Sequence, residues 1–422
     1  MCGKHINIGG AKNSALPILA ATLLSKNIFI IKNIPIIADI DTQLFILKQF
    51  NVQIHYINKT TLKIDTTKML IPKNIDYTKN TRGTYYFIGS TSVYNTNLEY
   101  ILNLGCDIDI RNIDYHISLL QLLGKTVELK HNSLFVSGCC LNNNITYTFL
   151  KPSVGATINA MFMYAHCTSD TIFKNYAKDP YIYNTIHLLQ KIGIHISYND
   201  ECIMIIGSKN NIIYNTSITH DVIEDPIEAL TYIIYAGIIL NENSISKYTI
   251  GPINTINLGY AHTLLESIGI FIVESHIKNI YYIKKTMLQP FHISTGYFPL
   301  IYTDIQPFLT LLALNIHGTS TITETIWNER FKYISQINLL GYKIIVKNNT
   351  IVIDNNPTLA YNVPNNIDFC CSDLRGGMAL LLLMRKHNIY KDPINKHYID
   401  RGYCDYEEKI RIILVNDKPL TI

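Results

Sequence analysis

The sequence predicts a mixed α/β fold built from one unit that is repeated six times. A short helix that ends in a leucine-rich turn, followed by a β-branched strand, recurs about every 70–75 residues. A second helical stretch and a strand precede each copy, as in 308–314 leading to 319–323, so each unit reads βαβαββ in outline. The copies end in the turns at 46–52, 119–125, 188–194, 264–270 and 337–343, with a weaker sixth near Asn416.

The hydrophobic pattern predicts that helices lie inside and sheets outside. Helices such as 308–314 are apolar nearly all round, which is typical of helices surrounded by protein. A Gly or Asn after each leucine pair is expected to supply a left-handed helix cap. The six units divide into two groups of three near the polar stretch 215–220, and 422 residues favour two domains. We expect one domain at 13–219 and another formed by 1–12 and 220–422, whose last unit the N-terminal strand completes.

Composition excludes several classes of protein. Hydrophobic residues make up 48% and charged residues 16%, as in a well-packed globular protein, and a net charge of +4 without a basic tail argues against nucleic acid. The longest apolar run, 378–384, is far shorter than the roughly 20 residues of a membrane span, and no signal peptide is seen. Nine scattered cysteines without a C-x-x-C pair argue against disulfides and zinc. We therefore expect a cytoplasmic protein, and a monomer.

The loop around Cys106 gathers reactive side chains. Gly105 makes a turn, Cys106 follows it, Arg111 comes five residues after the cysteine, and Asp114 and His116 open a helix. A thiol beside a guanidinium is suited to protonating a group next to a bound anion. The alternative is a turn with a core cysteine and a surface arginine, since free cysteines are often buried.

Seven stretches of the chain, in order, resemble the enolpyruvyl transferases. They are 9–17, the Cys106 loop, 151–157, 303–306, 322–331, 372–375 and 399–403. The resemblance covers essentially the whole chain, and it implies two inside-out α/β barrel domains, each of three βαβαββ repeats, with substrates in the cleft between them. Lys12-Asn13 and the loop cysteine favour the branch acting on a UDP-sugar over the branch acting on shikimate 3-phosphate.

The resemblance implies a reaction without metal or organic cofactor. The enolpyruvyl group of phosphoenolpyruvate passes to the 3-hydroxyl of UDP-N-acetylglucosamine by addition and elimination, and phosphate is released. This is the first committed step of peptidoglycan precursor synthesis, and a target of fosfomycin. Two alternatives remain open: an enzyme acting on shikimate 3-phosphate, and a non-catalytic UDP-sugar-binding relic, for which the extra charges Asp107 and Asp109 in the loop are the support.

The resemblance also assigns roles to residues. Cys106 donates a proton, since a free thiol has an ordinary pKa of about 8.5, and Asp304 accepts one. Lys12 and Arg401 complete the catalytic set, and Asp373 is a second candidate base or the partner of Arg375. The implied substrate-binding set is Lys12, Asn13, Arg82, Arg111, Asn112, Ile113, Asp114, Tyr115, Lys151, Pro152, Ser153, Val154, Asp304, Ile326, Asp373, Arg375 and Arg401.

Each role has a plainer alternative. Lys12 reads equally well as a solvated loop residue, and Arg401 as a turn residue paired with Asp400. Asp304 has the position of a helix N-cap, and Asp373 that of an ion-pair partner two residues before Arg375. The stretch 153–155 is either a turn whose N–H groups face the diphosphate or an ordinary start of a helix.

Overall fold

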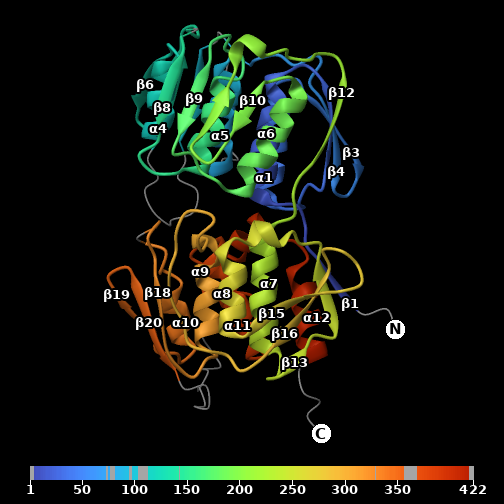
Figure 1. The fold of residues 1–422 in the computed structure, drawn as a ribbon, viewed down its shortest axis with the longest axis vertical. Coiled ribbons are helices and arrows are strands. Elements are labelled where there is room, and N and C mark those ends of the chain that lie inside the picture. The colour runs from blue at the N-terminus through green and yellow to red at the C-terminus, as the bar shows by residue number, and fades with distance from the viewer. Residues whose placement is uncertain are drawn as a thin grey trace. The chain divides into compact units, whose positions relative to one another are not determined.

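The computed structural model describes residues 4–72, 75–76, 81–94, 97–102, 113–141, 143–327, 329–355 and 368–417. The described chain divides into two units, which Figure 1 shows as ribbons. The N-terminal unit runs from Gly10 to Ile223. The C-terminal unit comprises the residues up to Gly9 and those from Glu224 onwards.

The divisions between the units differ from the expected ones by a few residues. We expected them after residues 12 and 219, and they lie after Gly9 and Ile223. Helix α1 (Lys12–Ala21) belongs as a whole to the N-terminal unit. Strand β12 (Ser217–Asp221) also stays there, because it pairs in parallel with β2 (Ile28–Lys32).

Three sheets of four, three and four strands form among the described residues of the N-terminal unit. Their strand orders are β12-β2-β4-β3, β5-β7-β6 and β10-β11-β9-β8. The further strands are β3 (Gln53–Asn58), β4 (Thr61–Asp65), β5 (Leu98–Ile101), β6 (Thr126–Lys130), β7 (Ser133–Ser137), β8 (Ile145–Thr148), β9 (Thr171–Lys174), β10 (Ile196–Tyr198) and β11 (Cys202–Ile205). The further helices are α2 (Ala38–Gln49), α3 (Tyr86–Ser92), α4 (Asp114–Leu122), α5 (Val154–Met163) and α6 (Pro180–Ile192). The run β8-α5-β9-α6-β10-β11 has the predicted order of one unit.

Two sheets of five and four strands form among the described residues of the C-terminal unit. The first contains β1 (Lys4–Asn7), β13 (Ser244–Ile245), β14 (Tyr248–Gly251), β15 (Ile270–Glu274) and β16 (Tyr281–Lys285). The second contains β17 (His292–Ser294), β18 (Gly318–Thr323), β19 (Ile345–Lys347) and β20 (Thr350–Asn355). The helices are α7 (Pro226–Ile239), α8 (Tyr260–Ile268), α9 (Gln306–Ala313), α10 (Ile334–Leu339), α11 (Leu374–Lys386) and α12 (Tyr406–Asp417).

The last repeat differs from the expected one. Between residues 368 and 417 the structure has helices α11 and α12 but no strand, apart from a single bridge between Cys370 and Ile394. Pro393 lacks an N–H for a ladder, and Asn395 has a positive φ of 59°, so the backbone beside Ile394 does not continue as a strand. We expected the N-terminal strand to complete this last unit, and that expectation is wrong. The strand pairs with β14, in the first sheet of the same half.

The five repeated helix ends are confirmed in detail. Helices α2, α4, α6, α8 and α10 are each followed by a residue with positive φ and then by an antiparallel hairpin. The positive-φ residues are Asn51, Gly124, Gly193, Gly269 and Gly341, with φ values of 57°, 93°, 99°, 109° and 90°. At Gly193 a Cβ would also lie 1.9 Å from the carbonyl oxygen of Asn211, so no larger residue fits.

The apolar helices lie inside each unit, as predicted. Every residue of α9 is buried, and α11 is buried from Leu374 to Arg385. Helix α9 packs against α7 and α11, whereas α3 packs against α1 and α5 in the N-terminal unit. Figure 1 shows the sheets around these helices within each unit. No helix in the described ranges has the length and apolar character needed to cross a membrane.

Lys386, at the end of α11, provides a test of this packing. Burial, and then repulsion from Lys285, lowers the pKa of Lys386 from 10.5 to about 8. Between these pH values the unfolded chain binds the additional proton, so stability rises with pH in this window. We expect Lys386→Met to stabilise the protein at pH 7 by up to about 3 kcal/mol and to flatten this rise. Denaturant unfolding at pH 7 and 9.5 measures both effects, with exposed Lys130→Met as control. An unchanged pH slope in Lys386→Met would contradict the account.

Candidate active site

Lys12 is held by a carboxylate on the neighbouring helix. It is the first residue of α1, and its Nζ lies 2.5 Å from Oδ2 of Asp39, in the first turn of α2. The two side chains are only 12% and 3% exposed, so Lys12 is not the solvated loop residue of the alternative reading. An ammonium group fixed at a helix N-terminus, where free N–H groups also favour anions, is well placed to bind a phosphorylated substrate. The next residue, Asn13, is half-buried.

Breaking this pair should destabilise the N-terminal unit. Asp39→Asn leaves the shielded ammonium of Lys12 without its countercharge, and we expect a loss of about 3 kcal/mol in the free energy of unfolding. Asp41 lies in the same helical turn and is exposed, so Asp41→Asn should change stability by less than about 0.5 kcal/mol. Denaturant unfolding of the two variants side by side is the measurement. Equal stabilities would show that the Lys12–Asp39 contact is energetically unimportant.

The start of α5 meets a tyrosine from α4. The backbone N–H of Lys151 donates to the hydroxyl of Tyr115 at 2.8 Å, and the Tyr115 ring packs edge-on against Phe149 with centroids 5.4 Å apart. Ser153 caps α5, and its Oγ accepts the N–H of Ala156 at 3.4 Å. The structure thus joins two of the predicted sugar-nucleotide segments at a helix N-terminus, which favours a diphosphate. In these segments Lys151 and Asp114 are exposed, while Ile113, Pro152 and Val154 are half-buried.

Asp304 is the exposed end of a buried cluster of charges in the C-terminal unit. It lies in the short 3-10 helix Thr303–Ile305 and is not an N-cap of α9, which begins at Gln306. Its Oδ1 accepts a hydrogen bond from Nη2 of Arg330 at 2.8 Å, and its Oδ2 accepts one from Nε of Arg375 at 3.3 Å. Both arginine side chains are almost fully buried, whereas Asp304 is 28% exposed. The two guanidinium groups fix the orientation of the carboxylate, and its partial exposure leaves it accessible to a substrate hydroxyl.

Asp373 has a structural role that the sequence left open. It caps α11, and its Oδ1 accepts the N–H groups of Arg375 and Gly376, each at 2.9 Å. The alternative reading, an ion pair between Asp373 and the Arg375 side chain, is wrong, because that guanidinium faces Asp304 and lies 5.1 Å from the centroid of the Tyr403 ring. Burial lowers the pKa of Arg375, but the nearby Tyr403 and Asp304 raise it, and the net result is a pKa above the ordinary value. Arg375 therefore stays a cation beside Asp304.

The remaining predicted residues are placed in part. Arg401 ends the 3-10 helix Lys396–Arg401 and is half-buried, and the half-buried Ile326 donates its N–H to Oε1 of Glu324 at 2.8 Å. Arg82 begins the 3-10 helix Arg82–Tyr85, and its side chain lies outside the described residues. Cys106, Arg111 and Asn112 lie outside them as well.

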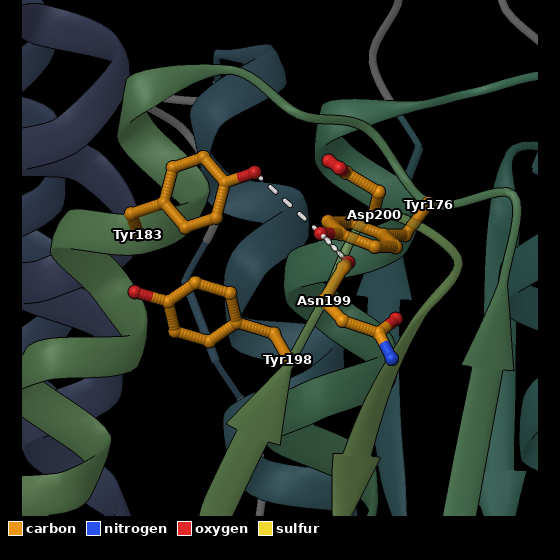
Figure 2. A pocket seen from close by; sticks show the side chains of 5 residues that line it. All are labelled: Tyr176, Tyr183, Tyr198, Asn199 and Asp200. Atoms are coloured by element: carbon orange, nitrogen blue, oxygen red, sulfur yellow. Dashed lines mark hydrogen bonds between the residues drawn. The ribbon is translucent and has the colours of Figure 1, made fainter.

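The N-terminal unit has an open hollow of about 450 Å³ that no sequence pattern predicted. Figure 2 shows its five lining side chains, Tyr176, Tyr183, Tyr198, Asn199 and Asp200. The Tyr183 and Tyr198 rings lie with centroids 5.0 Å apart, and the Tyr176 hydroxyl donates to the carbonyl of Asn199 at 2.6 Å. Asp200 is the charged group in this lining, and a carboxylate disfavours an anionic substrate. No predicted site residue lines the hollow, so we do not place the active site there.

No group of three His, Cys, Asp or Glu side chains in the described ranges is arranged to hold a metal ion.

The fold itself is similar to solved enolpyruvyl transferase structures. The enolpyruvyl transferase NikO from Streptomyces tendae matches with a TM-score of 0.80 at 20% identity, over 96% of this chain and 93% of that one. EPSP synthase from Acinetobacter baumannii matches with a TM-score of 0.63 at 13% identity, over 90% and 89%. The fold is therefore that of the enolpyruvyl transferases.

Sequence comparison gives the family. The family model for EPSP synthase (3-phosphoshikimate 1-carboxyvinyltransferase) matches residues 2–410. The UDP-N-acetylglucosamine 1-carboxyvinyltransferase of Buchnera aphidicola is 32% identical over 97% of this chain and 95% of its own length. The enzyme of the same name from Clostridium botulinum is 30% identical over 96% and 94%. The chain therefore belongs to the EPSP synthase family of enolpyruvyl transferases.

Proposed function

We propose that the protein transfers the enolpyruvyl group of phosphoenolpyruvate to the 3-hydroxyl of UDP-N-acetylglucosamine and releases phosphate. The observation that carries the proposal is the similarity, over nearly the whole chain, to relatives named for this reaction. The geometry of Asp304 supports it, because a partly exposed carboxylate fixed by two buried arginines suits a base that removes a hydroxyl proton.

The chemistry divides among the chain's own residues. Asp304 accepts the proton of the 3-hydroxyl as its oxygen attacks C2 of phosphoenolpyruvate, and Cys106 donates a proton to C3. The tetrahedral intermediate then loses a proton from C3 while the bond from C2 to the phosphate oxygen breaks, which restores the double bond. Lys12, Arg111 and Arg401 bind the phosphate and carboxylate groups, which suit guanidinium and ammonium partners.

We propose further that the two units are inside-out barrels, each of three repeats, and that the active site lies in a cleft between them. The buried helices and outer sheets of each unit support this organisation. The reaction would open peptidoglycan precursor synthesis, carried out by a monomer in the cytoplasm.

Phosphate release from phosphoenolpyruvate tests the proposal. We expect release with UDP-N-acetylglucosamine, and none with shikimate 3-phosphate or without an acceptor. Release with shikimate 3-phosphate alone would favour the sister reaction. Calorimetric binding of the UDP-sugar without any release would favour a binding protein.

A further inference from the structure

Glu324 is a buried carboxylate to which no role has been given so far. It directly follows β18, and the residue is 1% exposed. Its Oε1 accepts the hydroxyl of Thr295 at 2.8 Å, the N–H of Ile326 at 2.8 Å and the N–H of Trp327 at 3.2 Å. Its Oε2 accepts the hydroxyl of Thr303 at 2.9 Å. Four donors thus converge on the two oxygens of one buried carboxylate.

This carboxylate connects two segments that are distant in sequence. One is the turn 325–327, whose peptide groups it binds directly. The other is the 3-10 helix that carries Asp304, which it reaches through the hydroxyl of the preceding residue, Thr303. The same hydroxyl oxygen accepts Nη1 of Arg330 at 3.3 Å, and Arg330 in turn donates to Asp304 at 2.8 Å. The chain Glu324–Thr303–Arg330–Asp304 therefore fixes the proposed base at one end and the Ile326 peptide at the other.

We infer that Glu324 is a positioning residue for the acceptor substrate. The inference rests on the proposed function, in which Asp304 and Ile326 both contact the UDP-sugar. Glu324 sets the spacing between these two contacts. It acts through Thr303 and the turn, and it touches neither substrate. Among the described residues, Lys12 and Arg401, which the proposed function assigns to phosphoenolpyruvate, take part in none of the hydrogen bonds named above. Replacement of Glu324 should therefore weaken binding of the acceptor substrate and leave binding of phosphoenolpyruvate nearly unchanged.

Glu324→Gln is the sharpest change, because it conserves shape and removes the charge. All four partners donate a hydrogen bond to Glu324, and the NH2 group of a glutamine cannot accept a hydrogen bond. With the amide oxygen at the Oε1 position, the NH2 group faces Thr303, whose hydroxyl proton loses its acceptor. The NH2 group can donate to the Thr303 oxygen instead, but this reverses the hydrogen bond and removes the negative charge, so Thr303 holds Arg330 and Asp304 less firmly. Thr303→Val removes the same link from the other side, and Thr303→Ser keeps it.

Two readouts test the inference. Calorimetry gives the Kd of UDP-N-acetylglucosamine without turnover, and steady-state kinetics gives the KM of each substrate. We expect Glu324→Gln and Thr303→Val to raise the Kd and KM of the UDP-sugar by at least about tenfold, with the KM of phosphoenolpyruvate changed by less than about twofold. Thr303→Ser should match the wild type. Glu329→Gln, in the same segment at an exposed position, is the matched control.

The outcomes separate this inference from the proposed function. A wild type that turns over the UDP-sugar, with an unchanged Kd in Glu324→Gln, overturns the inference alone. Equal losses for both substrates, together with a lowered melting temperature, would show a merely structural role and overturn it as well. A wild type that neither binds nor converts the UDP-sugar overturns both the proposed function and the inference.

Discussion

Cys106→Ser is expected to release almost no phosphate, whereas Cys106→Asp should retain activity. A serine hydroxyl is far too weak an acid to protonate C3 of phosphoenolpyruvate, while a carboxylic acid can take over the role of the thiol. The loss in the serine variant should be about 10²- to 10⁴-fold in kcat, the usual contribution of a positioned general acid. Phosphate release by the wild type and both variants is the measurement.

Fosfomycin adds an independent readout to the same variants. We expect the wild type to be inactivated, because a thiol near cationic groups is reactive towards a small anionic electrophile. Cys106→Asp should resist the compound. Cys139 is an exposed free cysteine on the N-terminal unit, so Cys139→Ser should remain both active and sensitive. Full activity of Cys106→Ser, or resistance in Cys139→Ser, would exclude the proposed role of Cys106.

Asp304→Asn is expected to lower kcat by about 10²- to 10⁴-fold, since it removes the proposed base. Asp373→Asn is the matched comparison. Asparagine caps helices about as well as aspartate, so this variant should keep the α11 cap and lose less than about tenfold in kcat. Steady-state kinetics of the two variants, with melting temperatures recorded in parallel, distinguishes the two carboxylates.

The opposite pattern would assign the base differently. A large loss in Asp373→Asn with an active Asp304→Asn would make Asp373 the base, in spite of its two backbone hydrogen bonds. If Asp304→Asn lost activity only because Arg330 and Arg375 had lost their partner, Asp304→Glu should restore much of the activity, because it returns the charge. A general base displaced by one methylene should remain strongly impaired.

Local features of the fold could be predicted from the sequence, because their causes are local. The helix ends at Asn51 and Gly193 follow from which residues tolerate positive φ, and the buried helices follow from apolar residues on all faces. The pairing of β1 with β14 joins residues more than two hundred positions apart, so the sequence indicated the half of the chain but not the sheet. The absence of strands between residues 368 and 417 depends on single residues such as Pro393, within a pattern that otherwise looks regular.

The candidate site was predictable in its residues but not in their contacts. The resemblance named Asp304 and Arg375, yet their ion pair spans 71 positions and no local pattern indicates it. Arg330 lies in a stretch that carried the resemblance, but its role emerged only from its contact with Asp304. Glu324 lies in the same stretch, but it was assigned no role, since a carboxylate after a strand usually faces water. Asp373 could be recognised as a cap only once the extended backbone before α11 was known.

Proton NMR of the reaction products tests the central claim most directly. Purified protein is incubated with phosphoenolpyruvate and an equal mixture of UDP-N-acetylglucosamine and shikimate 3-phosphate. The account predicts a pair of new vinyl proton signals that correlate with C3 of the N-acetylglucosamine ring, together with free inorganic phosphate. Vinyl signals on shikimate 3-phosphate, or phosphate and pyruvate without any vinyl ether, would contradict it.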